Sequence, residues 1–136
     1  MKQRILIADD IDPIFIEQVE AVGYQCDYQP LIKLDQALQI IGGYEGLVIR
    51  SKFNVDKQVI DAGTKLRFVC RAGAGLDNVD EDYAGSKNIK LINASEGNMD
   101  AVGEHCVGLL LALMNHFNTA DAEIRAGQWK REDLYE

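Results

Sequence analysis

The segment 70–80 carries the residue types best suited to holding an anion; it reads Cys-Arg-Ala-Gly-Ala-Gly-Leu-Asp-Asn-Val-Asp. It follows a short apolar run, 66–69, that is typical of a buried strand. Glycines directly after a strand let the backbone turn tightly and present bare N–H groups to a ligand. The guanidinium group of Arg71 adds a permanent positive charge with bidentate geometry for a carboxylate or phosphate. The segment therefore predicts an anion site at a strand end.

A second arginine stands in a similar position. Arg50 and Ser51 follow the apolar run 46–49, and neighbouring parallel strands end at the same edge of a sheet. Two guanidinium groups opening onto one edge, in a chain of net charge −8, suit a doubly charged acid such as a phosphorylated hydroxy acid. The alternative is that either arginine only pairs with a nearby acid such as Asp77 or Asp80, and the sequence leaves both interpretations open.

These strand ends belong to a regular alternation of elements. Short apolar runs predict four strands, and a fifth is expected near 24–28. Helical spacing between the strands predicts four helices, the first of which has Asp12 as N-cap and Pro13 at its first position. The alternation predicts an α/β, flavodoxin-like, doubly wound parallel five-stranded sheet with right-handed crossovers. The expected strands are 5–8, 24–28, 46–49, 66–70 and 89–92, and the expected helices are 13–22, 34–41, 55–62 and 81–86.

The last third of the chain has a different pattern. Residues 99–126 predict one long helix, and between 101 and 114 apolar side chains occupy nearly every face of it. A helix that is apolar all round must be buried all round, so a second domain or a second copy of the chain is expected to cover it. We therefore expect a flavodoxin-like, ligand-binding domain at 1–98, a long helix and tail at 99–136, and a homo-oligomer formed through 99–118.

Composition limits the possible partners and compartments. The length of 136 residues suits one domain with a core, and the net charge of −8 argues against nucleic acid. Cys26, Cys70 and Cys106 form neither a metal pattern nor a disulfide framework. The first apolar run is too short for a signal peptide, and no run approaches the roughly 18 residues that span a bilayer. We expect a cytoplasmic protein without a metal site or a membrane segment.

Three short motifs suggest other functions but are incomplete. The opening 5–10 resembles a response-regulator receiver domain, but Arg50 stands where the phosphorylated aspartate should end the third strand, so Asp9 and Asp10 are expected to be solvated or to cap a helix. The two glycines of 73–75 lack the third glycine of a dinucleotide fingerprint, because that position is Asn78. The pair at 104–105, Glu-His, lies on neighbouring helical positions that do not face each other.

Taken together, the order of motifs resembles the D-2-hydroxyacid dehydrogenase family. The likeness covers essentially the whole chain and is strongest to the members that oxidise 3-phosphoglycerate in serine biosynthesis. It is carried by 48–51, the Arg-Ala-Gly-Ala-Gly-Leu-Asp-Asn-Val-Asp block at 71–80, Asn93-Ala94, Asn98, Ala-Val-Gly-Glu-His at 101–105, and Gly-Gln-Trp at 127–129.

The resemblance implies a substrate site at the two strand ends. It implies that Arg50, with Ser51 beside it, binds the phosphate end of 3-phosphoglycerate or of a related 2-hydroxy acid, and that Arg71 serves the same anionic end. It also implies two further contacts. The backbone N–H groups around Ala72 and Gly73 are expected to face the carboxylate, and Asn98 is expected to reach the substrate from the hinge.

The resemblance also implies what this chain is expected to lack. The family oxidises its substrate with NAD, held by a Rossmann domain whose glycine-rich loop is expected after Trp129. The catalytic arginine, glutamate and histidine belong to that region, so no catalytic or cofactor-binding residue is predicted here and the chain is expected to be inactive alone. The alternative is a non-catalytic, flavodoxin-like module that binds an anion or a protein partner.

Overall fold

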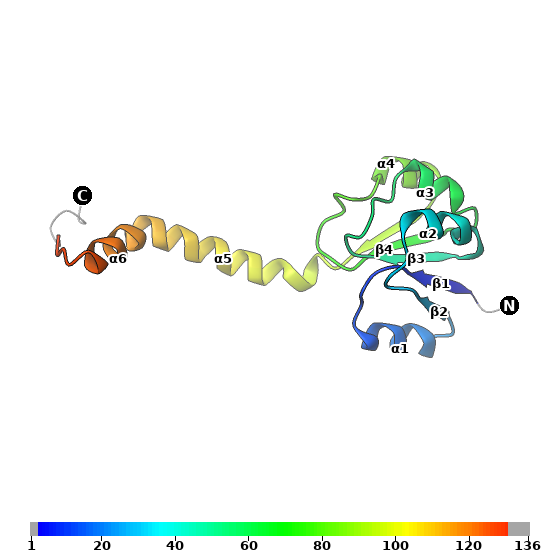
Figure 1. Ribbon diagram of the computed structural model, residues 1–136, viewed down its shortest axis with the longest axis horizontal. Coiled ribbons are helices and arrows are strands. Elements are labelled where there is room, and N and C mark those ends of the chain that lie inside the picture. Colours follow the sequence, from blue (N-terminus) through cyan, green and yellow to red (C-terminus); the bar gives the residue numbers. More distant parts are fainter. Residues whose placement is uncertain (1–2, 131–136) are drawn as a thin grey trace. The chain divides into compact units, whose positions relative to one another are not determined.

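The computed structural model describes residues 3–130. Five parallel strands form one sheet in the order β2-β1-β3-β4-β5 (Figure 1). This is the predicted flavodoxin-like order, and the strands lie within two residues of the expected positions. Their bounds are β1 Arg4–Ile7, β2 Gln25–Tyr28, β3 Gly46–Ile49, β4 Phe68–Arg71 and β5 Lys90–Asn93.

Helices cover both faces of this sheet. Helix α1 lies on one face, and α2, α3 and α4 lie on the other (Figure 1). Helix α1 begins as predicted, because the Asp12 carboxylate accepts a hydrogen bond from the backbone N–H of Ile14 and proline occupies the first helical position. The bounds are α1 Pro13–Ala21, α2 Leu34–Ile40, a 3₁₀ turn η1 Ile41–Gly43, α3 Lys57–Ala62 and α4 Glu81–Ser86.

The core follows from the alternation of side chains along each strand. In β1, Leu6 packs into the cluster under α2, α3 and α4, while Ile5 and Ile7 pack into the cluster under α1. All four residues of the central strand β3 are buried, which explains why its sequence is a continuous apolar run.

Strand register brings the carboxyl ends of the central strands to one edge. Ile49 of β3 pairs with Arg71 of β4, and Arg71 pairs with Asn93 of β5. On the other side, Ile7 of β1 pairs with Val48. The loops that follow β1, β3, β4 and β5 therefore start side by side.

The chain divides into two compact units, Met1–Ser95 and Glu96–Glu136. The second contains α5, Glu96–Met114, and α6, Phe117–Arg125. The single helix predicted over 99–126 is therefore wrong in one respect, because it is interrupted at His116, whose φ is 53°. The side chain of Asn115 donates to the carbonyl oxygen of Leu111 at 2.9 Å, a local hydrogen bond that competes with helix continuation.

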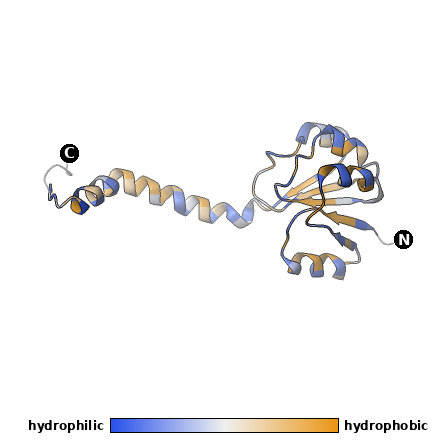
Figure 2. Cartoon of the chain, in the orientation of Figure 1, coloured by the Kyte–Doolittle hydropathy of each residue, from blue (hydrophilic) through white to orange (hydrophobic). Residues whose placement is uncertain are grey.

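Apolar residues recur along α5 (Figure 2). Among the described residues 3–130, none of the α5 side chains is buried. Within the described residues 3–130, no helix combines the length and apolar character needed to cross a membrane.

Candidate anion site at the carboxyl edge of the sheet

The two arginines singled out in the sequence end neighbouring strands. Arg71 is the last residue of β4 and pairs with Ile49, the residue directly before Arg50. The Arg50 side chain is exposed, and within residues 3–130 it makes no ion pair and no hydrogen bond to another side chain. It is therefore free to bind a ligand at this edge.

Arg71 is held much more tightly than Arg50. Its Nε donates to the carbonyl oxygen of Arg50 at 3.1 Å, and its Nη1 donates to the carbonyl oxygen of Gly75 at 2.8 Å. Its side chain is only 17% exposed, and Nη1 lies 3.7 Å from an Asp77 carboxylate oxygen that faces solvent. The alternative pairing with Asp77 is thus present, although an ion pair to so exposed a partner contributes little. Asp80 instead caps α4 by accepting from the N–H of Tyr83 at 3.0 Å.

The two glycines after β4 make room for Arg71 and for Asp77. A Cβ atom on Gly73 would lie 2.9 Å from Nη1 of Arg71, whereas one on Gly75 would lie 2.7 Å from a carboxylate oxygen of Asp77. Neither glycine has a positive φ. The expected tight turn is present, since the N–H of Gly73 donates to the carbonyl oxygen of Arg71, and the close approach of the guanidinium group is a further reason for glycine at position 73.

Two of the backbone amides predicted to face the ligand are already engaged. The N–H of Ala72 donates to the carbonyl oxygen of Ile49 at 2.8 Å, and that of Gly73 donates to Arg71 at 2.9 Å. Within residues 3–130, the next amides along the loop, those of Ala74 and Gly75, have no hydrogen-bond acceptor. The donors open to an anion therefore begin one residue later than the sequence suggested.

Asp9 has a role that the sequence did not reveal. Its Oδ2 accepts from the N–H groups of Arg50, Ser51 and Lys52 at 3.0, 3.0 and 3.1 Å. The expectation that Asp9 is solvated or caps a helix is wrong, because it binds the loop after β3. The sequence indicates this contact only indirectly, because a carboxylate directly after β1 lies beside the loop after β3 only if β1 and β3 are neighbouring strands. Ser51 itself is exposed.

Two asparagine side chains also hold the loops after β3 and β4 in place through hydrogen bonds. The side-chain amide of Asn78 donates to the carbonyl oxygens of Arg50 and Phe53 at 3.2 and 3.3 Å, and that of Asn93 donates to Ala74 at 2.6 Å. Oδ1 of Asn78 is buried without a hydrogen-bond partner in the described part of the chain. The asparagine that breaks the dinucleotide fingerprint therefore connects the loops after β3 and β4.

The remaining candidate groups lie elsewhere or show no catalytic arrangement. Asn98 belongs to α5 in the second unit, where its side chain is exposed, and its contact with a substrate stays a prediction. Burial raises the pKa of the Cys70 thiol, which disfavours the reactive thiolate. Among residues 3–130, no three His, Cys, Asp or Glu side chains gather as metal ligands.

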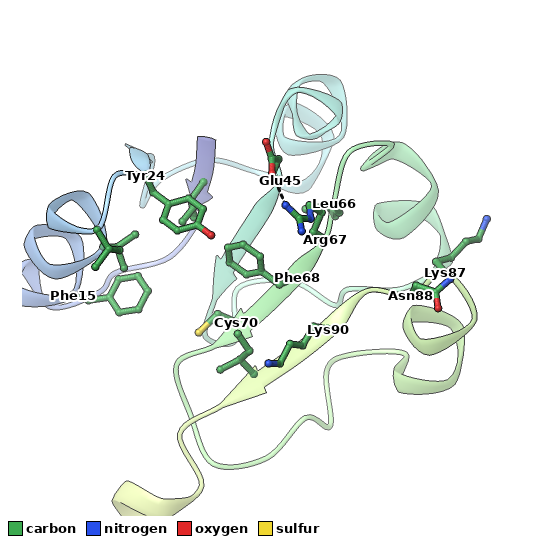
Figure 3. A pocket seen from close by; sticks show the side chains of 14 residues that line it. Phe15, Tyr24, Glu45, Leu66, Arg67, Phe68, Cys70, Lys87, Asn88 and Lys90 are labelled. Carbon is green, nitrogen blue, oxygen red and sulfur yellow. Dashed lines mark hydrogen bonds and ion pairs between the residues drawn. The ribbon is translucent and has the colours of Figure 1, made fainter. Parts of the chain in front are cut away.

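An apolar groove lies apart from the two arginines. It has a volume of about 730 Å³ and opens on the α1 face of the sheet, between α1 and strands β4 and β5. Figure 3 shows Phe15 and Tyr24 on one side of it and Phe68, Cys70 and Lys90 on the sheet side. Its lining includes neither Arg50 nor Arg71. This groove is therefore not the anion site.

The fold and these loops define a class of protein, a doubly wound α/β domain that presents cationic side chains and free amides where its parallel strands end. Comparison with known sequences narrows the class. Residues 5–133 match the family described as D-isomer specific 2-hydroxyacid dehydrogenase, catalytic domain. The chain belongs to this family.

Several curated relatives share the name D-3-phosphoglycerate dehydrogenase. The chain is 37% identical over 132 residues to D-3-phosphoglycerate dehydrogenase of Mycobacterium bovis and 30% identical over 131 residues to that of Synechocystis, and each alignment covers 96% of this chain and 24% of the relative. It is 33% identical over 130 residues to the enzyme of Sus scrofa, again over 96% of this chain and 24% of the relative. The chain thus spans about a quarter of the length of these relatives.

Solved structures agree on the fold. A Pyrococcus horikoshii protein gives a TM-score of 0.87 at 22% identity and covers 97% of this chain and 39% of its own length. The NAD+-bound 3-phosphoglycerate dehydrogenase of Entamoeba histolytica gives 0.64 at 24% identity, over 82% of this chain and 39% of that one.

Proposed function

We propose that the first unit is the substrate-binding part of an NAD-dependent D-2-hydroxyacid dehydrogenase and that it binds 3-phosphoglycerate or a closely related phosphorylated 2-hydroxy acid. The observation that carries this proposal is the exposed Arg50 side chain, which has no partner in the described chain and stands at the edge where Arg71 ends the next strand. The name shared by the relatives favours the same substrate.

The geometry suggests different tasks for the two arginines. Arg50 is free to form a charge-assisted, bidentate contact with the phosphate. Arg71 donates hydrogen bonds from Nε and Nη1 to backbone carbonyl oxygens. Its other N–H groups and its positive charge remain available to the same ligand. The free amides of Ala74 and Gly75 are the better candidates for the carboxylate.

The loop between β4 and α4 does not have the residues of an NAD site. A dinucleotide loop needs its third glycine at the start of a helix, whereas position 78 is an asparagine bonded to the neighbouring loop and α4 begins only at Glu81. In this proposal, NAD is bound by the region of the longer family members that is not aligned with this chain. We expect the chain alone to produce no NADH from 3-phosphoglycerate and NAD, and any turnover would contradict this.

A calorimetric titration with 3-phosphoglycerate tests the binding site. Arg50→Ala should weaken binding by about 1.5–3 kcal/mol, about 10- to 150-fold, the scale of a charge-assisted contact. Arg71→Ala should weaken it similarly, because it removes a charge and also loosens the loop. The control is Arg67→Ala, which removes an exposed arginine paired with Glu45 at the opposite end of β4.

Equal effects of the variants at positions 50 and 67 would mean that only overall charge matters and would overturn the site. Binding that neither Arg50→Ala nor Arg71→Ala alters would contradict it as well.

A second candidate function rests on a separate observation. Apolar side chains of α5 are 50–73% exposed in this chain, among them Val107, Leu111 and Leu113. We propose that 99–118 forms an interface with a second copy of the chain, because covering such a surface is favourable by about 25 cal/mol per Å² of apolar area.

A further inference from the structure

The loop that carries Arg50 is organised around one carboxylate. Asp9 accepts three consecutive backbone N–H groups, of Arg50, Ser51 and Lys52, on a single oxygen. Its other oxygen accepts from the N–H of Asp10 at 3.0 Å. Consecutive amides that converge on one point form an anion-binding concavity. Here the chain fills that concavity with its own side chain.

Topology explains why this residue reaches the loop. Strands β1 and β3 are parallel neighbours, and the N–H of Ala8 donates to the carbonyl oxygen of Val48 at 2.9 Å. Asp9 follows Ala8 directly and therefore stands beside the first residues after β3. Burial disfavours the charged form of Asp9, but hydrogen bonds from four backbone N–H groups outweigh it and lower the pKa of this carboxyl group.

The opposite side of the same loop is also fixed. The carbonyl oxygen of Arg50 accepts from Nε of Arg71 at 3.1 Å and from the side-chain amide of Asn78 at 3.2 Å. The backbone of Arg50 is thus held on both sides of its Cα atom. Its N–H donates to Asp9, and its carbonyl oxygen accepts from Arg71 and Asn78. Within residues 3–130, only its side chain has no hydrogen-bond partner.

We propose that Asp9 is a positioning residue that holds the loop 50–52 so that the Arg50 guanidinium group is presented to the ligand. The proposal rests on the function proposed above. It has a counterintuitive consequence, because a negative charge near an anion site repels the ligand. If Asp9 acted only through its charge, removing it would strengthen binding. A positioning role predicts weaker binding.

Three variants of the full chain separate these effects. Asp9→Ala removes the acceptor, and Asp9→Asn keeps an oxygen acceptor without the charge. Asp10→Ala is the matched control: it removes the same charge one residue away, from an exposed carboxylate whose side-chain partner is the hydroxyl group of Tyr28 at 2.9 Å. Titration with 3-phosphoglycerate should show about tenfold weaker binding for Asp9→Ala. Asp9→Asn should lie between it and wild type, and Asp10→Ala should bind at least as well as wild type.

Two further readouts distinguish positioning from general stability. Amide hydrogen exchange at 50–52 should be about tenfold faster in Asp9→Ala than in Asp10→Ala, because the three N–H groups lose their acceptor. Added formate should restore part of the 3-phosphoglycerate binding of Asp9→Ala by entering the vacated concavity. In wild type the same formate should only compete with the ligand.

Each outcome decides a different claim. If Asp9→Ala binds as tightly as Asp10→Ala, or if the amides at 50–52 exchange no faster, the positioning role is overturned. If wild type fails to bind 3-phosphoglycerate, the proposed function fails and the exchange measurement alone decides whether Asp9 fixes the loop. Should Asp9→Ala not fold, Asp9→Asn carries the same comparison, since it retains the shape of the side chain.

Discussion

The two units use their apolar residues in opposite ways. In the first, Leu47 and Ile49 of β3 are 0% exposed, because residues of α2, α3 and α4 from the same chain pack against them. In the second, Leu109 and Leu110 of α5 are 58% and 54% exposed. The sequence pattern is strongly apolar in both units. An apolar pattern therefore says that a surface must be covered, and it does not say whether the same chain supplies the cover.

The largest expected effect on stability concerns the core of the first unit. Leu47→Ala should lower the free energy of unfolding of the first unit by about 2–5 kcal/mol, because it leaves a cavity in a packed core. The control is Leu31→Ala at a side chain that is 90% exposed, which should change stability by less than about 0.5 kcal/mol. Urea denaturation followed by circular dichroism measures both. Similar values for the two variants would mean that Leu47 is not buried as described.

The next prediction concerns self-association through the exposed apolar residues of α5 in the second unit. At tens of micromolar, sedimentation should show the wild-type chain as an oligomer, and Leu110→Asp should shift it toward monomer because a charge would be buried in an apolar interface. Leu31→Asp introduces the same charge at an exposed apolar position outside α5 and should leave the association unchanged. A wild-type chain that sediments as a monomer would remove the basis for this interface.

The smallest effect concerns the hydroxyl group of the buried Tyr44 in the first unit. Burial, together with a hydrogen bond that its hydroxyl group donates to Asp27, raises the pKa of Tyr44 to about 12. Because the folded state favours the protonated hydroxyl, this contribution to stability is complete below pH 10, the ordinary tyrosine value, and is lost as the pH rises toward 12. Ultraviolet absorbance titration should show a step near pH 12 that Tyr44→Phe removes. Tyr44 ionising near pH 10 would contradict the described burial.

The sequence predicts the secondary-structure elements of this fold better than it predicts individual contacts between residues. Strands β1 and β3 were predictable because each is a short apolar run, and the alternation of strands with helices favoured a parallel, doubly wound order. The break in the long helix was missed because Asn115 and His116 are tolerated within helices, and only their backbone geometry marks the interruption. Local pattern therefore predicts elements better than it predicts where they end.

The candidate site divides in the same way. That Arg50 and Arg71 share an edge followed from strand order alone. The contacts of Asp9 and Asn78 were not predictable, since Asp9 lies 41–43 residues away from the amides that it binds. Glycine at position 73 could be noticed in the sequence, but its reason, the room it leaves for Arg71, depends on a side-chain position that no spacing rule encodes.

The central claim is that the carboxyl edge of the sheet, presented by Arg50 and Arg71, holds a doubly negative acid. Titrating the isotopically labelled chain with 3-phosphoglycerate and following its backbone amide signals tests this most directly. The account predicts that the largest changes fall at 50–52 and 71–75. Changes centred on Phe15, Phe68 and Ile92 in the apolar groove, or no changes at all, would contradict it.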